Sequence, residues 1–306
     1  MSFDPDVLIP NAFATTSEPN LARALLACRN EQLDQDFLKF RDLAVSKSRV
    51  GVAGRETEPL ARSSPRWLEI LDVRGHGHEL RAALVDASGQ CWGALNFQRE
   101  ASRPFTDRDV RRVECGIERD AAAIARSMVA SRVPAADGLE PGAVWLDADG
   151  DIVFASPAAL RWLEVLDAPS YPGFSRALLA GLTMRATAGH GTGSAYAIRA
   201  RSADGRWMRA RAEEVTLPDR NRRGVAVVID AARAGDVLPL AAAAYRLTGR
   251  ELDVIRGVLN GLDTRSVAAW LHLSEYTVQD HLKSVFGKTG VRSRRELAHQ
   301  FALQFG

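Results

Sequence analysis

The stretch Ser274-Glu-Tyr-Thr-Val-Gln-Asp-His-Leu-Lys283, preceded in the chain by Leu247-Thr-Gly-Arg-Glu251 and Gly261-Leu262, decides the C-terminal fold. Apolar residues recur every three or four positions across this region, which is the period of an amphipathic helix. Residues that begin and end helices stand between the apolar runs. The pattern therefore predicts three short helices, with a tight turn between the second and the third.

Helix starts and ends are marked one after another in this region. Thr248 and Glu251 have the spacing of a capping box, and Asn260-Gly261 predicts the end of that helix. Asp263 can cap a second helix, Ser274 caps a third that Gly290 ends, and Ser293 with Glu296 opens a short fourth. The predicted inward residues, helix by helix, are Leu252, Ile255, Val258 and Leu259; Val267, Ala268 and Leu271; Val278, Leu282, Val285 and Phe286; and Leu297 and Phe301.

The third predicted helix has a polar outward face that suits DNA. With its apolar stripe inward, Gln279, Asp280 and Lys283 must face outward. Glutamine can pair with adenine, aspartate can accept from cytosine N4, and lysine can reach guanine or phosphate. The predicted contacts to the DNA backbone are Tyr276, Thr277, Ser284, Arg265, Lys288, Arg292, Arg294 and Arg295. The alternative is an ordinary helical bundle with a solvated charged face.

The charge distribution favours the DNA interpretation. Residues 246–306 contain nine Lys and Arg against six Asp and Glu, so this segment carries +3. The whole chain has 40 basic and 38 acidic residues, which leaves 31 against 32, or −1, for the remainder. All excess positive charge therefore lies in the C-terminal segment, where phosphate contacts would need it.

The motif resembles the LuxR/GerE-type helix-turn-helix family. The matching positions are Leu247-Thr-x-Arg-Glu251, Gly261-Leu262, Val267-Ala268, Leu271, Ser274-Glu275, Thr277-Val278, His281-Leu282, Lys288 and Gly290-Val291-x-Ser293-Arg294-x-Glu296-Leu297. The resemblance implies that the third helix reads bases through Gln279, Asp280 and Lys283. Gln279 stands where the family often has lysine, so the base preference is expected to differ. The resemblance also implies a homodimer on two half-sites of double-stranded DNA.

The first part of the chain reads as helices around a hairpin. A helix is predicted over Asn20–Ala44, and strands over Glu79–Val85 and Cys91–Phe97 with an Asp86–Gly89 turn between them. A long helix is predicted to open at Thr106, with Asp109 in its first turn. Its apolar stripe is Val110, Val113, Ile117, Ala121, Ile124 and Met128. The stripe either covers its own sheet or pairs with the same helix of a second copy.

A second pattern follows a linker at Pro134–Pro141. Short strands are predicted at Val144–Leu146 and Ile152–Ala155 around an Asp147–Gly150 turn, and Ser156-Pro157 predicts a helix start. A three-stranded meander is predicted from strands at Ala195–Arg201, Trp207–Val215 and Val225–Ile229, with an Asp204-Gly205 turn. Ala231–Leu240 is predicted to be a second linker. Phe154, Trp162 and Trp207 are expected in the core.

These two patterns resemble a GAF domain, chiefly through Gly75–Phe97, and a PAS domain. The expected fold class is therefore multidomain α+β: GAF-like and PAS-like sheet-and-helix sensor domains followed by an all-α four-helix helix-turn-helix domain. The predicted bounds are 1–133, 138–231 and 241–306. Both sensor folds often hold a ligand, so an unknown small-molecule effector is expected. Its predicted pocket residues are His78, Arg81, Cys91 and Trp92, while His76 and His78 are expected in a loop.

The remaining expectations concern chemistry and location. Cys28, Cys91 and Cys115 have neither the number nor the spacing of a disulfide framework or zinc site, and no metal or other cofactor is predicted. No signal peptide or bilayer-spanning run is visible, so a cytoplasmic protein without membrane contact is expected. The main hypothesis is a non-enzymatic transcriptional regulator. The alternatives are a thiol-based GAF-fold enzyme or redox sensor that uses Cys91, and an interaction protein with an idle DNA-binding domain.

Overall fold

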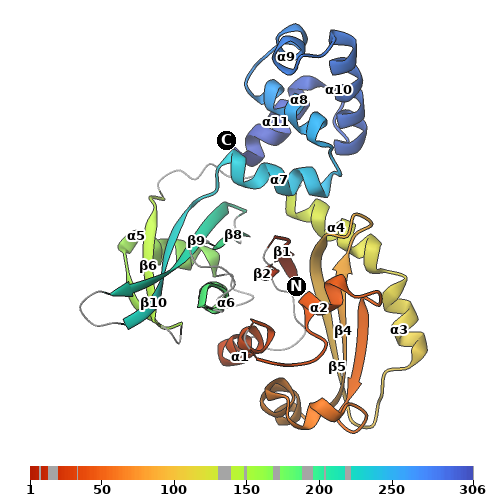
Figure 1. The fold of residues 1–306 in the computed structure, drawn as a ribbon, viewed down its shortest axis with the longest axis vertical. Coiled ribbons are helices and arrows are strands. Elements are labelled where there is room, and N and C mark those ends of the chain that lie inside the picture. Colours follow the sequence, from red (N-terminus) through yellow and green to blue (C-terminus); the bar gives the residue numbers. More distant parts are fainter. Residues whose placement is uncertain are drawn as a thin grey trace. The chain divides into compact units, whose positions relative to one another are not determined.

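The computed structural model describes residues 1–6, 8–12, 20–32, 34–129, 139–147, 150–167, 173–187, 196–202, 205–217 and 222–305. Contacts divide the chain into two compact units, residues 1–124 with 138–231 and residues 125–137 with 232–306. Figure 1 shows two sheets in the first unit and a group of helices in the second. The expected α+β architecture with a C-terminal helical domain is therefore confirmed.

The first sheet contains five antiparallel strands in the order β2-β1-β5-β4-β3. They are β1 (Ser2–Asp4), β2 (Ile9–Ala12), β3 (Val50–Gly54), β4 (His76–Val85) and β5 (Cys91–Glu100). The predicted β4–β5 hairpin is confirmed, and the Asp86 carboxylate accepts from the backbone N–H groups of Ser88 and Gln90 in its turn. The loop predicted around His76 and His78 is wrong, since both residues belong to β4 and face β5.

Helices predicted as continuous are interrupted in this part of the chain. The predicted Asn20–Ala44 helix is two helices, α1 (Leu21–Gln32) and α2 (Phe40–Val45), because Leu38 between them adopts a left-handed backbone conformation. The helix predicted from Thr106 is likewise α3 (Asp107–Glu114) and α4 (Ile117–Val129), separated at Cys115-Gly116. Thr106 caps α3 and Asp109 lies in its first turn, as predicted, and the structure shows that the two residues form a capping box.

The stripe on these helices faces the first sheet in part. Ile117 and Ala121 are buried, and a Cβ at Gly93 of β5 would come within 3.2 Å of the Ile124 side chain. The short segments η1 (Pro59–Arg62), η2 (Trp67–Leu71) and η3 (Asp72–Arg74) precede β4. Trp67 and Leu71 of η2 are fully buried, so this segment forms part of the core beside the sheet.

The second sheet repeats the strand order of the first. Its strands are β6 (Gly142–Asp147), β7 (Ile152–Ala155), β8 (Tyr196–Arg201), β9 (Trp207–Leu217) and β10 (Arg222–Ala231), in the order β7-β6-β10-β9-β8. Numbered within each sheet, both orders are 2-1-5-4-3. The predicted strand pair and meander are confirmed. Some predicted positions lie outside the described residues: 134–138 of the linker, 148–149 and 204 of the two turns, and 195 of the first meander strand.

One face of the second sheet is covered by α5 (Pro157–Leu166) and α6 (Phe174–Thr187), which share a single core with it. Ser156 caps α5 by accepting from the Ala159 N–H, as predicted. Trp162 and Trp207 are buried, but the expectation for Phe154 is wrong because its side chain is 59% exposed. Phe154 pairs with Trp145 on the sheet face opposite the core, so its apolar character does not report burial.

The two sheets of the first unit contact each other through the N-terminal segment. α1 packs on α6, and the buried Cys28 lies 3.8 Å from the Ala177 carbonyl oxygen. The fully buried Asp4 carboxylate of β1 accepts from Arg199 of β8 through its backbone N–H, Nε and Nη2, at 2.7, 2.9 and 2.7 Å. This ion pair joins residues that are far apart in the sequence.

The second unit contains α7 (Ala234–Ala244), α8 (Gly249–Leu259), α9 (Thr264–Leu271), α10 (Glu275–Thr289) and α11 (Arg294–Phe305). The linker predicted over Ala231–Leu240 is wrong, since most of it is α7. The Asp236 carboxylate caps this helix by accepting from the Arg233 N–H, and Val237, Leu238, Leu240 and Ala241 are buried. α7 packs on α11, where the Gln300 amide donates to the Tyr245 hydroxyl. None of the helices that the structure describes could cross a membrane.

Candidate nucleic-acid interface

α9 and α10 form a helix-turn-helix whose turn is three residues long, His272-Leu273-Ser274. His272 ends α9 in a left-handed conformation at φ 55°, and the Leu273 N–H donates to the Ala268 carbonyl. Ser274 then caps α10 by accepting from the Thr277 N–H at 3.0 Å. The chain thus reverses between the two helices with the backbone groups at both helix ends satisfied. This is the arrangement in which the second helix can enter the major groove.

A close approach of α8 and α9 supports the pair. Gly257 is buried in the middle of α8, and a Cβ there would lie 2.7 Å from a methyl group of Val267. Val267, Val278 and Val285 are fully buried, which confirms three of the predicted inward residues. Leu252, Leu259, Leu271 and Phe286 are only partly buried, and Val254, which the sequence analysis passed over, takes an inner position of α8.

Glu251 connects α8 to α10. Its carboxylate accepts from the Thr248 N–H at 2.6 Å, which confirms the predicted capping box. It also accepts from the Ser284 hydroxyl at 2.6 Å and from Lys288 Nζ at 2.8 and 2.7 Å. Burial raises the pKa of Glu251, but the hydrogen bonds from Lys288, Ser284 and Thr248 outweigh this effect and lower the pKa to about 2. The ionised carboxylate therefore holds α10 against the start of α8.

The outward face of α10 carries the predicted base-reading residues. Gln279, Asp280 and Lys283 are all exposed, and Lys283 Nζ lies 3.7 Å from Asp280 Oδ1, one turn away. An exposed pair of this kind contributes little stability, so either side chain can leave it for another partner. Tyr276 is 71% exposed at the start of the helix. Thr277 beside it shares a hydrogen bond with the Ser274 hydroxyl.

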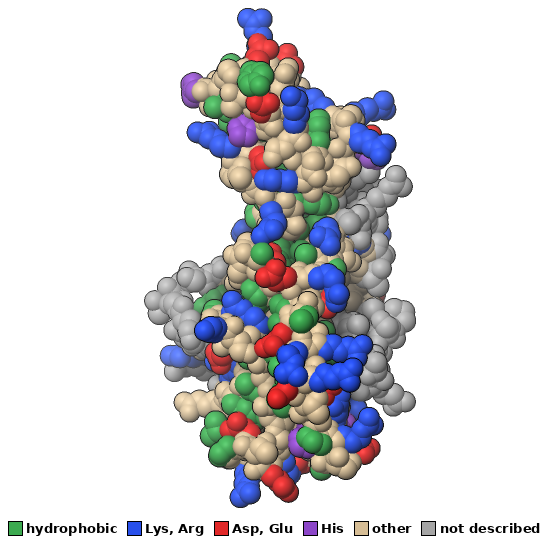
Figure 2. All heavy atoms as spheres, turned by 90° about the vertical axis from the view of Figure 1, so that its right-hand side faces the viewer, with side chains coloured by type: hydrophobic (Ala, Val, Ile, Leu, Met, Phe, Trp, Pro, Cys, Tyr) green, Lys and Arg blue, Asp and Glu red, His purple; other side chains and the backbone are tan. Residues whose placement is uncertain are grey.

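The predicted backbone contacts fall into two groups. Arg265, Arg292 and Arg295 are exposed, and the described part of the chain gives them no ion pair. Ser284 and Lys288 are instead bound to Glu251, and Arg294 donates to the Leu262 carbonyl. Figure 2 shows Lys and Arg side chains spread over the C-terminal helices at the top of the view, with a few carboxylates among them.

The four predicted pocket residues lie in different places. Arg81 lines a cavity of about 610 Å³ in the first unit, as does His76. His78 does not line it and is 3.0 Å from the Ala101 carbonyl oxygen through Nε2. Trp92 is fully buried away from the cavity, with its indole N–H donating to Asp86 at 2.9 Å. Cys91 belongs to an apolar core cluster.

The surroundings of Cys91 do not suit a nucleophile. Its side chain is buried, and this burial raises the pKa of the thiol to about 11. The reactive form of cysteine is the thiolate, which is scarce at neutral pH when the pKa is so high. Among the described residues, no group of three or more His, Cys, Asp or Glu side chains could hold a metal ion.

Sequence reasoning missed two features of these sites. The Glu251–Lys288 pair spans 37 residues, and the capping-box spacing revealed only the local half of its role. The acidic and basic residues around the cavity, Glu31, Arg66 and Glu79, were not singled out either. The sequence did offer a signal for them, because Glu79 stands inside a predicted strand. A charged side chain on a buried strand needs a partner of opposite charge.

Comparison with known proteins assigns the C-terminal segment. Residues 245–301 match the luxR family of bacterial regulatory proteins. The Escherichia coli nitrate/nitrite response regulator protein NarP is 40% identical over 60 residues, which are 20% of this chain and 28% of that protein. The Bacillus subtilis transcriptional regulatory protein YhcZ is 38% identical over 61 residues, with the same two coverages. The alignments thus span less than a third of either relative.

Solved structures give a weaker likeness. A structure of Vibrio cholerae VqmA, described as a LuxR-type receptor, aligns with 53% of this chain and 82% of its own at 16% identity and a TM-score of 0.24. So low a score establishes no common overall arrangement. The C-terminal segment is a luxR-family helix-turn-helix, and this assignment rests on its sequence and on the geometry of α8–α11.

Proposed function

We propose that this protein is a sequence-specific DNA-binding transcriptional regulator that reads the major groove with α10. The observation that carries the proposal is the exposed row Gln279, Asp280 and Lys283 on a helix whose other face is fixed by Glu251. These three side chains have the hydrogen-bonding groups that distinguish base pairs. Their helix follows a three-residue turn within a luxR-family segment.

The proposed backbone contacts are the exposed arginines Arg265, Arg292 and Arg295, together with Tyr276 and Thr277 at the start of α10. Ser284, Lys288 and Arg294 are proposed to act mainly by fixing the helices, because their polar groups are engaged within the domain. Each would have to leave its partner to reach a phosphate. Buried and multiply hydrogen-bonded partners such as Glu251 are costly to abandon.

The first unit is proposed to supply the regulatory input as a GAF-like and a PAS-like domain. Each sheet has five antiparallel strands in the order 2-1-5-4-3, and the first borders a cavity large enough for a small molecule. Two copies of the chain would place two α10 helices on half-sites about one turn of DNA apart, as dimeric helix-turn-helix proteins do. A small molecule in the first unit would then change how the two helices meet the DNA.

Selection from a randomised duplex pool, followed by fluorescence anisotropy of the enriched sequence, tests the proposal. We expect binding whose affinity falls steeply with salt. The Lys283→Ala variant should lose ~1–3 kcal/mol, roughly a 5- to 150-fold increase in Kd, with relaxed preference at one base position. A loss equal on all sequences would make Lys283 a phosphate contact instead.

Arg223→Ala provides a matched control. Arg223 lies on β10 in the first unit and its side chain is 77% exposed, compared with 75% for Lys283. Both substitutions remove one exposed positive charge, so each lowers the net charge of the chain by the same amount. The proposal predicts that Arg223→Ala leaves the Kd for the enriched DNA sequence unchanged. If the pool yields no enriched sequence and no salt-dependent binding, the proposed function is wrong.

A further inference from the structure

The cavity in the first unit is lined by both charged and apolar side chains. Its volume of about 610 Å³ is that of a site for a small organic molecule. Glu79 and Arg81 of β4 and their partners Gln98 and Asn96 of β5 share one face of the sheet and line it. The apolar lining includes Phe3, Ile9, Ala24, Phe40, Ile70 and Ala94. An occupant would therefore combine a polar group with an apolar body.

Positive charge predominates among the charged side chains of the lining. The lining contains the arginines Arg23, Arg66, Arg74 and Arg81 but only two carboxylates, Glu31 and Glu79. Burial and the nearby Arg74 lower the pKa of His76, so this residue is neutral at pH 7. Four guanidinium groups against the two lining carboxylates and the buried Asp36 carboxylate beside Arg66 leave a surplus of +1 around the cavity. Such a surplus favours an anion over a neutral or cationic molecule.

Arg81 is held in place but incompletely paired. Its guanidinium lies 3.7 Å over the Phe40 ring, and Nη2 donates to Glu31 at 2.7 Å. The Nε and Nη1 groups are buried and have no hydrogen-bond partner among the described residues. Buried N–H groups of a charged side chain are costly when unpaired. The residue is 3% exposed, so these donors lie away from bulk solvent.

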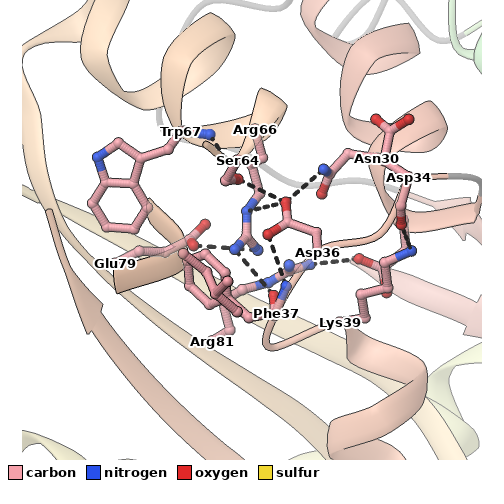
Figure 3. Close-up of polar contacts among 12 residues, drawn as sticks. Asn30, Asp34, Asp36, Phe37, Lys39, Ser64, Arg66, Trp67, Glu79 and Arg81 are labelled. Atoms are coloured by element: carbon pink, nitrogen blue, oxygen red, sulfur yellow. Dashed lines mark hydrogen bonds and ion pairs between the residues drawn. The ribbon is translucent and has the colours of Figure 1, made fainter. Parts of the chain in front are cut away.

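Arg66 shows the same deficiency beside it. Figure 3 shows its guanidinium between Asp36 and Glu79, from which it is separated by 3.6 and 3.4 Å. It donates through Nη2 to the Phe37 carbonyl, while Nε and Nη1 have no hydrogen-bond partner in the described part of the chain. These two nitrogens are the atoms that face Asp36 and Glu79, so Arg66 is paired with carboxylates of the protein itself. Arg81 is therefore the residue whose planar donor group is left to bind a further carboxylate.

We infer that this cavity binds a small organic carboxylate with an apolar body, whose carboxylate displaces Glu31 from Arg81. The inference deepens the proposed function, since it names the class of effector that the first unit would sense. Glu31 is the last acidic residue of α1, and its other oxygen accepts from the Phe40 N–H at 2.6 Å. Displacing it releases the end of α1 from β4, and α1 also packs on α6. Binding would therefore be communicated to both sheets.

Isothermal titration of the full chain without DNA tests this inference. The probes are octanoate, 4-phenylbutyrate and indole-3-acetate, each compared with its primary amide, which has the same body without the charge. We expect at least one acid to bind, and its amide to bind at least tenfold more weakly. Absence of heat with all three acids, or equal affinity of acid and amide, would overturn the inference.

Three variants separate a binding role from a structural one. Arg81→Lys keeps the charge but loses the planar donor group, so the acid's Kd should rise at least tenfold while circular dichroism stays unchanged. Glu31→Gln removes the competing carboxylate, so the Kd should fall, which a merely structural role would not produce. Glu213→Gln, an exposed carboxylate of β9, is the matched control and should leave the Kd unchanged. Unchanged affinity in both Arg81→Lys and Glu31→Gln would refute the site.

These titrations contain no DNA, so their outcome is independent of the DNA-binding experiment. Carboxylate binding by a protein that fails to select DNA would overturn the proposed function alone. DNA selection by a protein that binds none of the acids would overturn the carboxylate site alone.

Discussion

Replacing Glu251 with glutamine tests how α10 is held in the C-terminal domain. The substitution keeps the size of the side chain and an oxygen that can still accept from the Thr248 N–H. It removes the negative charge that receives the Ser284 hydroxyl and both bonds from Lys288. We expect the C-terminal domain to lose stability and α10 to lose its fixed position, while the first unit is unaffected.

The magnitude follows from the pKa of the carboxyl group. A shift from the ordinary value of 4.5 to about 2 means that the fold favours the ionised form. At 1.36 kcal/mol for each pKa unit, this preference amounts to roughly 3 kcal/mol. Lys288 is a third exposed and can be solvated when its partner is lost, so the Glu251→Gln variant should lose about 2–3 kcal/mol of unfolding free energy.

Hydrogen–deuterium exchange of the full chain at pH 7 measures this loss locally. Peptides from α8 and α10 should exchange about 30- to 150-fold faster in the variant, since every 1.4 kcal/mol is a factor of ten. Peptides from the first unit provide the internal control. Exchange in α8 and α10 that is within about threefold of the wild type would refute the reasoning, because 0.6 kcal/mol is too little for the pairing that the structure shows.

The pH dependence gives a second criterion with a definite sign. The pKa of Glu251 is lower in the folded state, so its stabilising effect is fully present above pH 4.5 and is lost as the pH falls toward 2. In calorimetric scans, the gap in Tm between the wild type and Glu251→Gln should therefore close over this range. Glu275→Gln is the control: this carboxylate is exposed in the first turn of α10, so it should cost no more than about 1 kcal/mol.

Two further predictions concern the first unit. Iodoacetamide at pH 8 should label only the exposed Cys115 of the native protein, and should reach Cys28 and Cys91 after unfolding. The reason is that burial raises the pKa of the Cys28 and Cys91 thiols to about 12 and about 11. Rapid labelling of Cys91 in the native protein, measured by peptide mass spectrometry, would support the hypothesis of a thiol enzyme or redox sensor. In urea titrations, Asp4→Asn should lower the unfolding free energy of the first unit by about 3 kcal/mol, because it leaves Arg199 buried without its main charged partner. A change below about 1 kcal/mol would contradict a stabilising Asp4–Arg199 ion pair.

The C-terminal helices could be predicted in detail because their signals are local. Thr248, Asp263 and Ser274 cap the helices as expected, and Gly261 and Gly290 adopt the left-handed conformation expected at helix ends. Each cap depends on a side chain and a backbone group that are two or three residues apart, so sequence spacing is sufficient. Ser293 accepts from the Glu296 N–H as expected, but the Glu296 carboxylate accepts from Arg292 rather than completing the box.

Features fixed by distant contacts could not be predicted in the same way. The segment predicted as a linker over Ala231–Leu240 contains Gly235 and Pro239, which disfavour a helix, yet burial of the apolar face of α7 against α11 outweighs their cost. The prediction of a single Asn20–Ala44 helix was wrong because distant contacts here interrupt a helix that the local pattern favours. The non-helical segment between α1 and α2 is fixed by Asp36, whose carboxylate accepts from Asn30, Phe37 and Ser64, and Ser64 is 28 residues away in the sequence.

The repeated strand order of the two sheets shows why topology is hard to read from residues alone. In each sheet the first strand lies between the second and the fifth, and the fifth is central, but the connections differ: α1, α2 and a long segment before β4 in one, α5 and α6 in the other. The inner face of the second sheet is apolar throughout, with Ile198, Met208, Val225 and Val227 buried. The corresponding face of the first carries Glu79 and Arg81. One strand order thus encloses an apolar core in one case and a charged cavity in the other, which is why a search for an effector site belongs in the first sheet.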